Sequence, residues 1–145
     1  MTHSSKIWRL GWALAAWILM ACGPIEADSA GNLNGTSWRL ISYRNAEGQT
    51  VHVLPGTEIT ADFQDGGIGG KATCNSYFGE VVVKGNQLTL QGIGMTEMYC
   101  FPEENMEQEA AYLAALSAAG SYQVDGARLV ISDPAGRIVL TYAAR

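Results

Sequence analysis

Basic residues and histidines are scarce in this sequence. Its 145 residues hold 9 Lys and Arg against 14 Asp and Glu, which gives a formal net charge of −5. Because a nucleic-acid-binding face needs clustered Lys and Arg, this balance argues against nucleic acid as a partner. The only histidines are His3 and His52, and the three cysteines are widely separated. No set of side chains has the spacing of a zinc site, and we expect no metal and no cofactor.

Long apolar runs are also absent. The uncharged segment 10–21 has twelve residues, whereas a helix that crosses a bilayer needs about 20. Lys6 and Arg9 precede it, and a basic region followed by an apolar one is typical of a secretory signal. The residues Leu19-Met20-Ala21-Cys22 resemble the bacterial lipobox, in which a signal peptidase cuts before a lipidated Cys. We predict a lipoprotein signal peptide over residues 1–21 and acyl chains on Cys22. The alternative is a secreted protein in which Cys22 keeps a free thiol.

The chain after residue 21 is more acidic than the whole. Lys6 and Arg9 leave with the signal peptide, so Lys+Arg falls from 9 to 7 against 14 acids, and the net charge becomes −7. Anionic headgroups repel such a domain, so we expect acyl chains rather than a basic patch to hold it at the membrane. Residues 22–33 are small and polar and are predicted to be a flexible tether. Gly23, not Asp, follows Cys22, which in enteric-type sorting predicts the outer membrane, facing the periplasm.

Residues 34–145 are predicted to form one β-rich domain. A hydrophobic content of 48% excludes a disordered chain, and 17 glycines favour many turns. Ile59, Ala61 and Phe63 alternate with other residues as in a half-buried strand, and Gly85-Asn86 is typical of a hairpin turn. The expected strands cover residues 36–43, 58–63, 71–78, 80–84, 87–90, 122–124, 128–132 and 137–142.

One helix is expected before the three strands that close the chain, residues 122–124, 128–132 and 137–142. Pro102 suits its first position and Gly120 its end. The predicted inward stripe consists of Met106, Ala110, Leu113 and Ser117, widened by Leu116. Carboxylates near the start match the positive end of the helix dipole, and we expect them to face solvent rather than to bind calcium. These are Glu103, Glu104, Glu107 and Glu109.

A glycine-rich segment, residues 66–72, invites comparison with a phosphate-binding loop. Asp65 and Ala72 stand where a Walker A loop needs Gly and Ser or Thr, so the pattern fails at both positions. A strand is expected to follow, whereas pyrophosphate binding needs a helix N-terminus there. We interpret the segment as a turn or bulge between strands.

Two cysteines remain if Cys22 carries lipid. Cys74 and Cys100 are then an even pair in an oxidising compartment, and we predict a disulfide between them. It would join the strand that contains Cys74 to the start of the helix. One alternative is two buried free thiols. Another is a nucleophilic pair of either cysteine with His52, but no residue has a nucleophile-elbow setting. We therefore expect His52 in an exposed loop, no catalytic residue and no enzyme.

Three segments of the chain resemble those of one family. Residues 35–40 (GTSWRL) resemble an opening G-x-x-W strand, residues 70–79 (GKATCNSYFG) a G-x-x-G-C-N-x-[FY]-x-G segment, and residues 96–100 (TEMYC) a T-[RK]-M-x-C segment. In this order they resemble the META domain, the family of the heat-shock lipoprotein HslJ. The resemblance is carried by Gly35, Trp38, Asn75, Gly79, Thr96 and Met98. Thr73 stands where the family has Gly, and Glu97 where it has a basic residue.

The resemblance implies a small antiparallel β-barrel-like fold with one helix and a lipocalin-like topology. It implies no catalytic activity and an association with envelope stress. The leading hypothesis is a non-enzymatic, lipid-anchored envelope protein with a stress-response or structural interaction role.

Two other hypotheses remain open from the residues. The first is a small apolar ligand inside the barrel, and the second is a protein partner bound by Tyr77-Phe78 or Tyr99-Phe101. A pocket of several hundred Å³ would favour the ligand. A packed interior with an exposed apolar patch would favour the partner.

Overall fold

The computed structural model describes Met1 and residues 32–145, and these residues contain nine strands and one helix. The elements in chain order are β1 (Thr36–Arg44), β2 (Thr50–His52), β3 (Thr60–Gln64), β4 (Gly67–Lys71), β5 (Ser76–Lys84), β6 (Gln87–Met95), α1 (Glu104–Ser117), β7 (Ser121–Asp125), β8 (Arg128–Ser132) and β9 (Ile138–Ala144).

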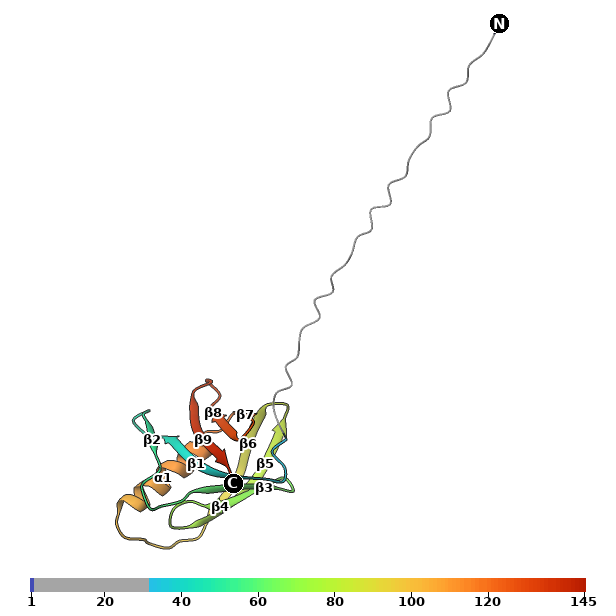
Figure 1. The fold of residues 1–145 in the computed structure, drawn as a ribbon. Helices are drawn as coiled ribbons and strands as arrows, with labels where there is room; N and C mark the ends of the chain where they lie inside the picture. The colour runs from blue at the N-terminus through green and yellow to red at the C-terminus, as the bar shows by residue number, and fades with distance from the viewer. Residues whose placement is uncertain (2–31) are drawn as a thin grey trace.

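β1 is paired along both edges, and this closes the sheet on itself. The strand order is β2-β1-β3-β4-β5-β6-β7-β8-β9, with a further pairing of β1 with β9, and the pairings are antiparallel. β2 and β3 follow one another along β1, because Arg39 pairs with β3 whereas Ser42 pairs with β2. The result is a barrel-like ring of strands (Figure 1). This confirms the predicted fold class, which is mainly β with one helix.

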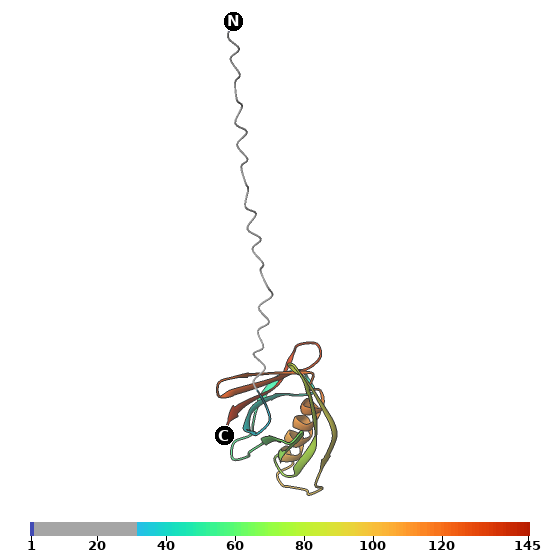
Figure 2. The same ribbon diagram turned by 90° about the vertical axis from the view of Figure 1, so that its right-hand side faces the viewer.

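α1 lies on the inner side of the curved sheet (Figure 2). It contacts β1, β6 and β9. Tyr112 and Leu116 point inward from the helix and are fully buried. The helix therefore fills interior space that a ring of strands alone would leave open to a ligand.

The remaining interior is filled by apolar side chains from the strands. Ile59, Ala61 and Phe63 are buried, as their alternation predicted. The largest fully buried apolar side chains are Tyr112, Tyr142, Ile59, Leu88, Leu116, Leu129, Ile131 and Leu140. Removal of this apolar surface from water is the main driving force for folding.

One strand prediction was wrong and one strand was missed. Residues 71–78 do not form one strand, because β4 ends at Lys71, residues 72–75 form a connection, and β5 begins at Ser76. β2 was not predicted, and it places the exposed His52 in a short strand rather than in a loop.

The glycine-rich segment is a strand and not a turn or bulge. β4 occupies residues 67–71 and pairs with β3 on one side and β5 on the other. A Cβ atom on Gly70 would collide with the carbonyl oxygen of Thr60. Close approach of neighbouring backbones therefore requires this glycine.

The helix differs from its prediction in its start and in its inward face. α1 begins at Glu104, not at Pro102. Of the predicted stripe, only Leu116 is fully buried. The buried residues of the helix are Gln108, Glu109, Tyr112, Ala115 and Leu116. Polar Gln108 and Glu109 are tolerated inside because hydrogen bonds satisfy both side chains, as described below.

The packed domain starts one residue before the predicted boundary at residue 34. Leu33 is 3% exposed and belongs to the core, so the predicted tether over residues 22–33 reaches too far. Cys22 and the predicted signal peptide, apart from Met1, lie outside the described residues. In the described part of the chain, no helix has the length and apolar character needed to cross a membrane.

Candidate functional site: the disulfide end of the strand ring

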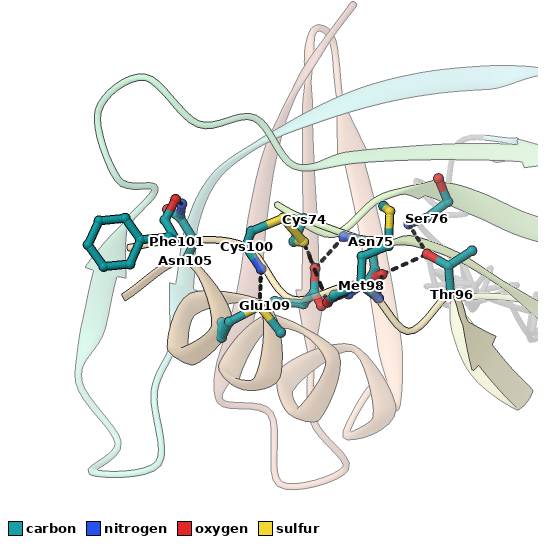
Figure 3. Close-up of a disulfide and its surroundings, with 10 residues drawn as sticks. Cys74, Asn75, Ser76, Thr96, Met98, Cys100, Phe101, Asn105 and Glu109 are labelled. Carbon is teal, nitrogen blue, oxygen red and sulfur yellow. Dashed lines mark hydrogen bonds between the residues drawn. A yellow bond between two sulfur atoms is a disulfide. The ribbon is translucent and has the colours of Figure 1, made fainter. Parts of the chain in front are cut away.

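A disulfide marks one end of the ring, which we call the disulfide end. It joins Cys74, in the connection between β4 and β5, to Cys100, in the segment between β6 and α1 (Figure 3). The two Cα atoms are 5.9 Å apart, within the usual range for a disulfide. The predicted bridge is present, although Cys74 lies in a connection and not in a strand.

Asn75 and Glu109 form a buried polar pair beside this disulfide. The exposed fractions of the two residues are 1% and 2%. Glu109 Oε2 accepts hydrogen bonds from the backbone N–H groups of Cys74, at 2.9 Å, and Asn75, at 2.7 Å. Glu109 Oε1 accepts a third from Asn75 Nδ2 at 2.6 Å. The prediction that Glu109 faces solvent was therefore wrong, and its carboxyl group instead ties the helix to the β4–β5 connection.

The same asparagine also holds the segment that follows β6. Asn75 Oδ1 accepts hydrogen bonds from Met98 N and Thr96 Oγ1, both at 2.7 Å, and Asn75 Nδ2 donates to Met98 O at 3.0 Å. Thr96 Oγ1 in turn accepts from Ser76 N at 3.2 Å. Asn75, just before β5, and the motif residues Thr96 and Met98, just after β6, thus meet in one network (Figure 3).

Gln108 forms a second polar anchor one helical residue before Glu109. Its Oε1 accepts from Leu54 N at 2.7 Å, and its Nε2 donates to Thr57 Oγ1 at 2.9 Å and to Thr73 Oγ1 at 2.8 Å. Thr73 has a φ of +117°, in a region that β-branched residues avoid. This backbone conformation is the physical reason that glycine suits position 73.

Three tyrosine hydroxyls form a chain through the interior. Tyr77 donates to Thr60 O at 2.8 Å, and the hydroxyls of Tyr77 and Tyr112 are 2.7 Å apart. Those of Tyr112 and Tyr142 are 3.1 Å apart. Each hydroxyl has one hydrogen, so Tyr142 donates to Tyr112 and Tyr112 donates to Tyr77. Burial raises the pKa of all three tyrosines. The chain satisfies the polar atoms that the aromatic core brings inside.

The other motif residues stabilise the ring and not the disulfide end. Gly35 has a φ of +78° and donates its N–H to Phe63 O at 2.7 Å. Trp38 is buried, and its Nε1 donates to Thr36 Oγ1 at 2.7 Å. Gly79 leaves room for the neighbouring strand, because a Cβ there would lie 3.2 Å from Gln91 O. These three residues are structural.

The segment next to the disulfide exposes large apolar side chains. We call residues 98–101 the 98–101 loop. The exposed fractions are 54% for Met98, 72% for Tyr99 and 86% for Phe101, and Figure 3 shows Phe101 pointing away from the helix and the disulfide. Of the aromatics considered from the sequence, Tyr77 belongs to the core, whereas Phe78 is exposed.

The described residues show no grouping typical of an active site. His52 is exposed on β2, and both Cys74 and Cys100 are in the disulfide, so neither is a nucleophile. No group of three or more His, Cys, Asp or Glu side chains in the described ranges is placed to hold a metal ion.

The fold and the site define a class of small domain: an antiparallel strand ring around one helix, closed at one end by a disulfide and a buried Asn–Glu pair. The META domain family model matches residues 31–145. The chain belongs to the META domain family.

Solved structures show the same fold. An NMR structure of a protein from Burkholderia xenovorans is 26% identical, covers 78% of this chain and 83% of its own, and has a TM-score of 0.66. A second NMR structure is 22% identical, with coverages of 76% and 89% and a TM-score of 0.56. A crystal structure of a DUF4847 family protein from Bacteroides vulgatus is 15% identical, with coverages of 77% and 93% and a TM-score of 0.51. No curated protein matches the chain.

Proposed function

We propose that the chain is a non-enzymatic protein of the bacterial envelope that is held at the outer membrane by lipid on Cys22. Its domain serves an interaction role in the structure or the stress response of the envelope. The observation that carries this proposal is the exposure of Met98, Tyr99 and Phe101 beside the disulfide. Exposed aromatic side chains on a fixed backbone are typical binding anchors in protein interfaces.

The 98–101 loop is held in place before any partner binds. Cys100 is linked to Cys74, and both backbone polar groups of Met98 are bonded to Asn75. A loop that is already ordered loses little conformational entropy on binding, so its apolar contacts translate into affinity. A purely structural loop would need the same bonds but would not need to expose three large apolar side chains.

The loop also lies far from the point where the chain enters the domain. Leu33 lines a cleft together with Val83, which lies near the last residue of β5. Thr96, just before the 98–101 loop, is instead bonded to Ser76, the first residue of β5. At about 3.3 Å per residue, Ser76 and Val83 are roughly 23 Å apart. Figures 1 and 2 both place the start of the domain, just before β1, and the β6–α1 segment at opposite ends of the domain. A domain tethered through Leu33 would therefore present the loop away from its membrane.

A ligand in the ring interior has less support. Tyr112, Tyr142 and Leu116 fill that space and are fully buried. The cleft beside Leu33 has a volume of about 180 Å³, below the roughly 300–1,000 Å³ of typical ligand sites. Two larger grooves, of about 500 and 520 Å³, lie between the β1–β2 turn and α1 rather than inside the ring. A packed interior with exposed apolar side chains favours the protein partner.

Site-specific photocrosslinking in cells tests the interaction role. A photoreactive residue at Tyr99 is expected to form a discrete crosslinked product, and one at Ile138, which is also exposed but lies on β9, is not. Tyr99→Ser with Phe101→Ser is expected to abolish complementation of a deletion strain under envelope stress, at unchanged protein level. The matched control, Ile41→Ser with Ile138→Ser, is expected to complement. Equal behaviour of the two double variants would contradict the proposal.

Membrane fractionation tests the anchor separately. Cys22→Ala is expected to leave the protein uncleaved or soluble, because the acyl chains have no other attachment point. A Cys22→Ala protein that fractionates with membranes at its mature size would contradict lipid attachment.

A further inference from the structure

A groove runs between the β1–β2 turn and the outward side of α1. Its volume is about 520 Å³. Its apolar lining comes from three elements of the fold: Tyr43 on β1, Val51 on β2 and Ala111 on α1, with Leu54 following β2. Tyr43 belongs to the core, and Val51 and Ala111 pack against it, so this part of the groove floor is fixed by the fold.

The rim of this groove is acidic. Glu47 lies in the β1–β2 turn, and Glu104 and Glu107 lie in the first turn of α1. The helix dipole accounts for acids at a helix start, but it does not account for Glu47, which another element supplies. None of the described residues that line this groove is Lys, Arg or His, and Arg44 and Arg137 line an adjoining groove that shares Glu47 and Ala111 with it.

These three carboxylates have no cationic partner in the described part of the chain. The ion pairs formed there are Arg137–Asp133 and Arg145–Asp62. The nearby Tyr43 responds to the charge, because burial and then the negative charge of Glu107 raise its pKa. Unpaired like charges around a half-apolar groove create a negative potential that a ligand of opposite charge relieves.

We propose that this groove binds a cationic amphipathic segment of a protein partner. An apolar side chain of the segment packs on Tyr43, Val51 and Leu54, while its Lys or Arg residues pair with Glu47, Glu104 and Glu107. Nucleic acids and anionic membrane surfaces carry the wrong charge for this rim. The inference does not depend on the 98–101 loop, since it is carried by different residues. The groove nevertheless begins close to the end of that loop, because Asn105 Nδ2 donates to Phe101 O at 3.4 Å.

Binding of a labelled, blocked peptide of Lys-Leu-Ala repeats to the full chain, followed by fluorescence anisotropy, tests the proposal. The peptide is expected to bind saturably and more weakly as salt is raised, and a Glu-Leu-Ala peptide is expected not to bind. The triple variant Glu47→Gln/Glu104→Gln/Glu107→Gln is expected to lower the affinity about tenfold, because three exposed pairs are lost.

A charge-matched control separates the groove from general electrostatic attraction. Asp65→Asn/Glu80→Gln/Asp125→Asn also removes three exposed carboxylates, but none of them lines the groove. This variant is expected to bind the Lys-Leu-Ala peptide as the unmodified chain does. Ala111→Arg, which fills the groove and adds a positive charge, is expected to block binding, and an unchanged circular dichroism spectrum shows that the fold is kept.

Three results would overturn the proposal. They are no saturable binding of the Lys-Leu-Ala peptide, equal weakening by the two triple variants, and equal binding of the Glu-Leu-Ala peptide. Because Tyr99→Ser with Phe101→Ser leaves the groove intact, its effect on crosslinking or complementation is read independently of these measurements.

Discussion

The side chain of Glu109 on α1 accepts hydrogen bonds from both the backbone N–H and the Nδ2 of Asn75, at 2.7 and 2.6 Å. This pair connects the helix to the β4–β5 connection, and Asn75 extends the connection to Met98 after β6. Three chain segments that are distant in sequence are therefore held at one point. The disulfide of Cys74 and Cys100 reinforces that point covalently.

Removal of the Glu109 carboxyl group is expected to destabilise the fold strongly. Glu109→Ala leaves buried N–H donors without acceptors, each of which costs about 1–3 kcal/mol. We expect a loss of about 3 kcal/mol or more in the free energy of unfolding, measured by urea denaturation followed by circular dichroism. Glu109→Gln places an amide N–H₂ against N–H donors and is also destabilising. Glu107→Ala, an exposed neighbour on the same helix, is expected to change stability by less than about 0.5 kcal/mol.

Loss of the disulfide is expected to cost about 2–4 kcal/mol, because it closes a chain segment with a sequence separation of 26. Cys74→Ser/Cys100→Ser is the test, with the melting temperature as the measurement, and we expect a drop of several degrees or more. A reductant is expected to lower the melting temperature of the unmodified chain in the same way and to leave that of the double variant unchanged. If the double variant has the same melting temperature as the oxidised, unmodified chain, the disulfide does not contribute to stability.

Thr73 combines an unfavourable backbone conformation with a useful side-chain bond, and two variants separate these effects. Both Thr73→Gly and Thr73→Ala remove the acceptor for Gln108 Nε2. Only glycine adopts a φ of +117° freely, and a strained residue costs about 1–3 kcal/mol. Thr73→Gly is therefore expected to be more stable than Thr73→Ala by about 1 kcal/mol or more in chemical denaturation. Equal stabilities would mean that the backbone at position 73 carries no strain.

Alkaline pH is expected to unfold the domain through its buried tyrosines. Folding raises the pKa of Tyr77, Tyr112 and Tyr142, so the folded state holds these protons more tightly than the unfolded state. Their contribution is complete below the unfolded-state pKa of about 10 and is lost as the pH rises above it. Tyrosinate absorbance should therefore show these three residues ionising together with unfolding. Tyr99→Phe, at an exposed position, should not move the unfolding midpoint.

Several elements of the fold follow from local sequence patterns. The alternation of Ile59, Ala61 and Phe63 predicted a half-buried strand, and Gly85-Asn86 predicted the hairpin between β5 and β6, because both patterns act within a few residues. The disulfide was also predictable, since Cys74 and Cys100 were the pair left once Cys22 was assigned to lipid. The META motifs added the barrel-like fold, which alternation alone does not specify.

The tertiary structure decided the parts that depend on partners far along the chain. A helical stripe predicted from hydrophobicity placed Glu109 in solvent, whereas donors from Cys74 and Asn75 make its burial favourable. Residues 67–71 have the composition of a turn, but β3 and β5 on either side stabilise them as a strand. Tyr77 and Tyr99 have the same chemistry, and only the closure of the ring determines that the first is buried and the second exposed. Sequence therefore determines local conformation and covalent chemistry here, while burial of polar groups and exposure of apolar ones depend on which segments the closed sheet brings together.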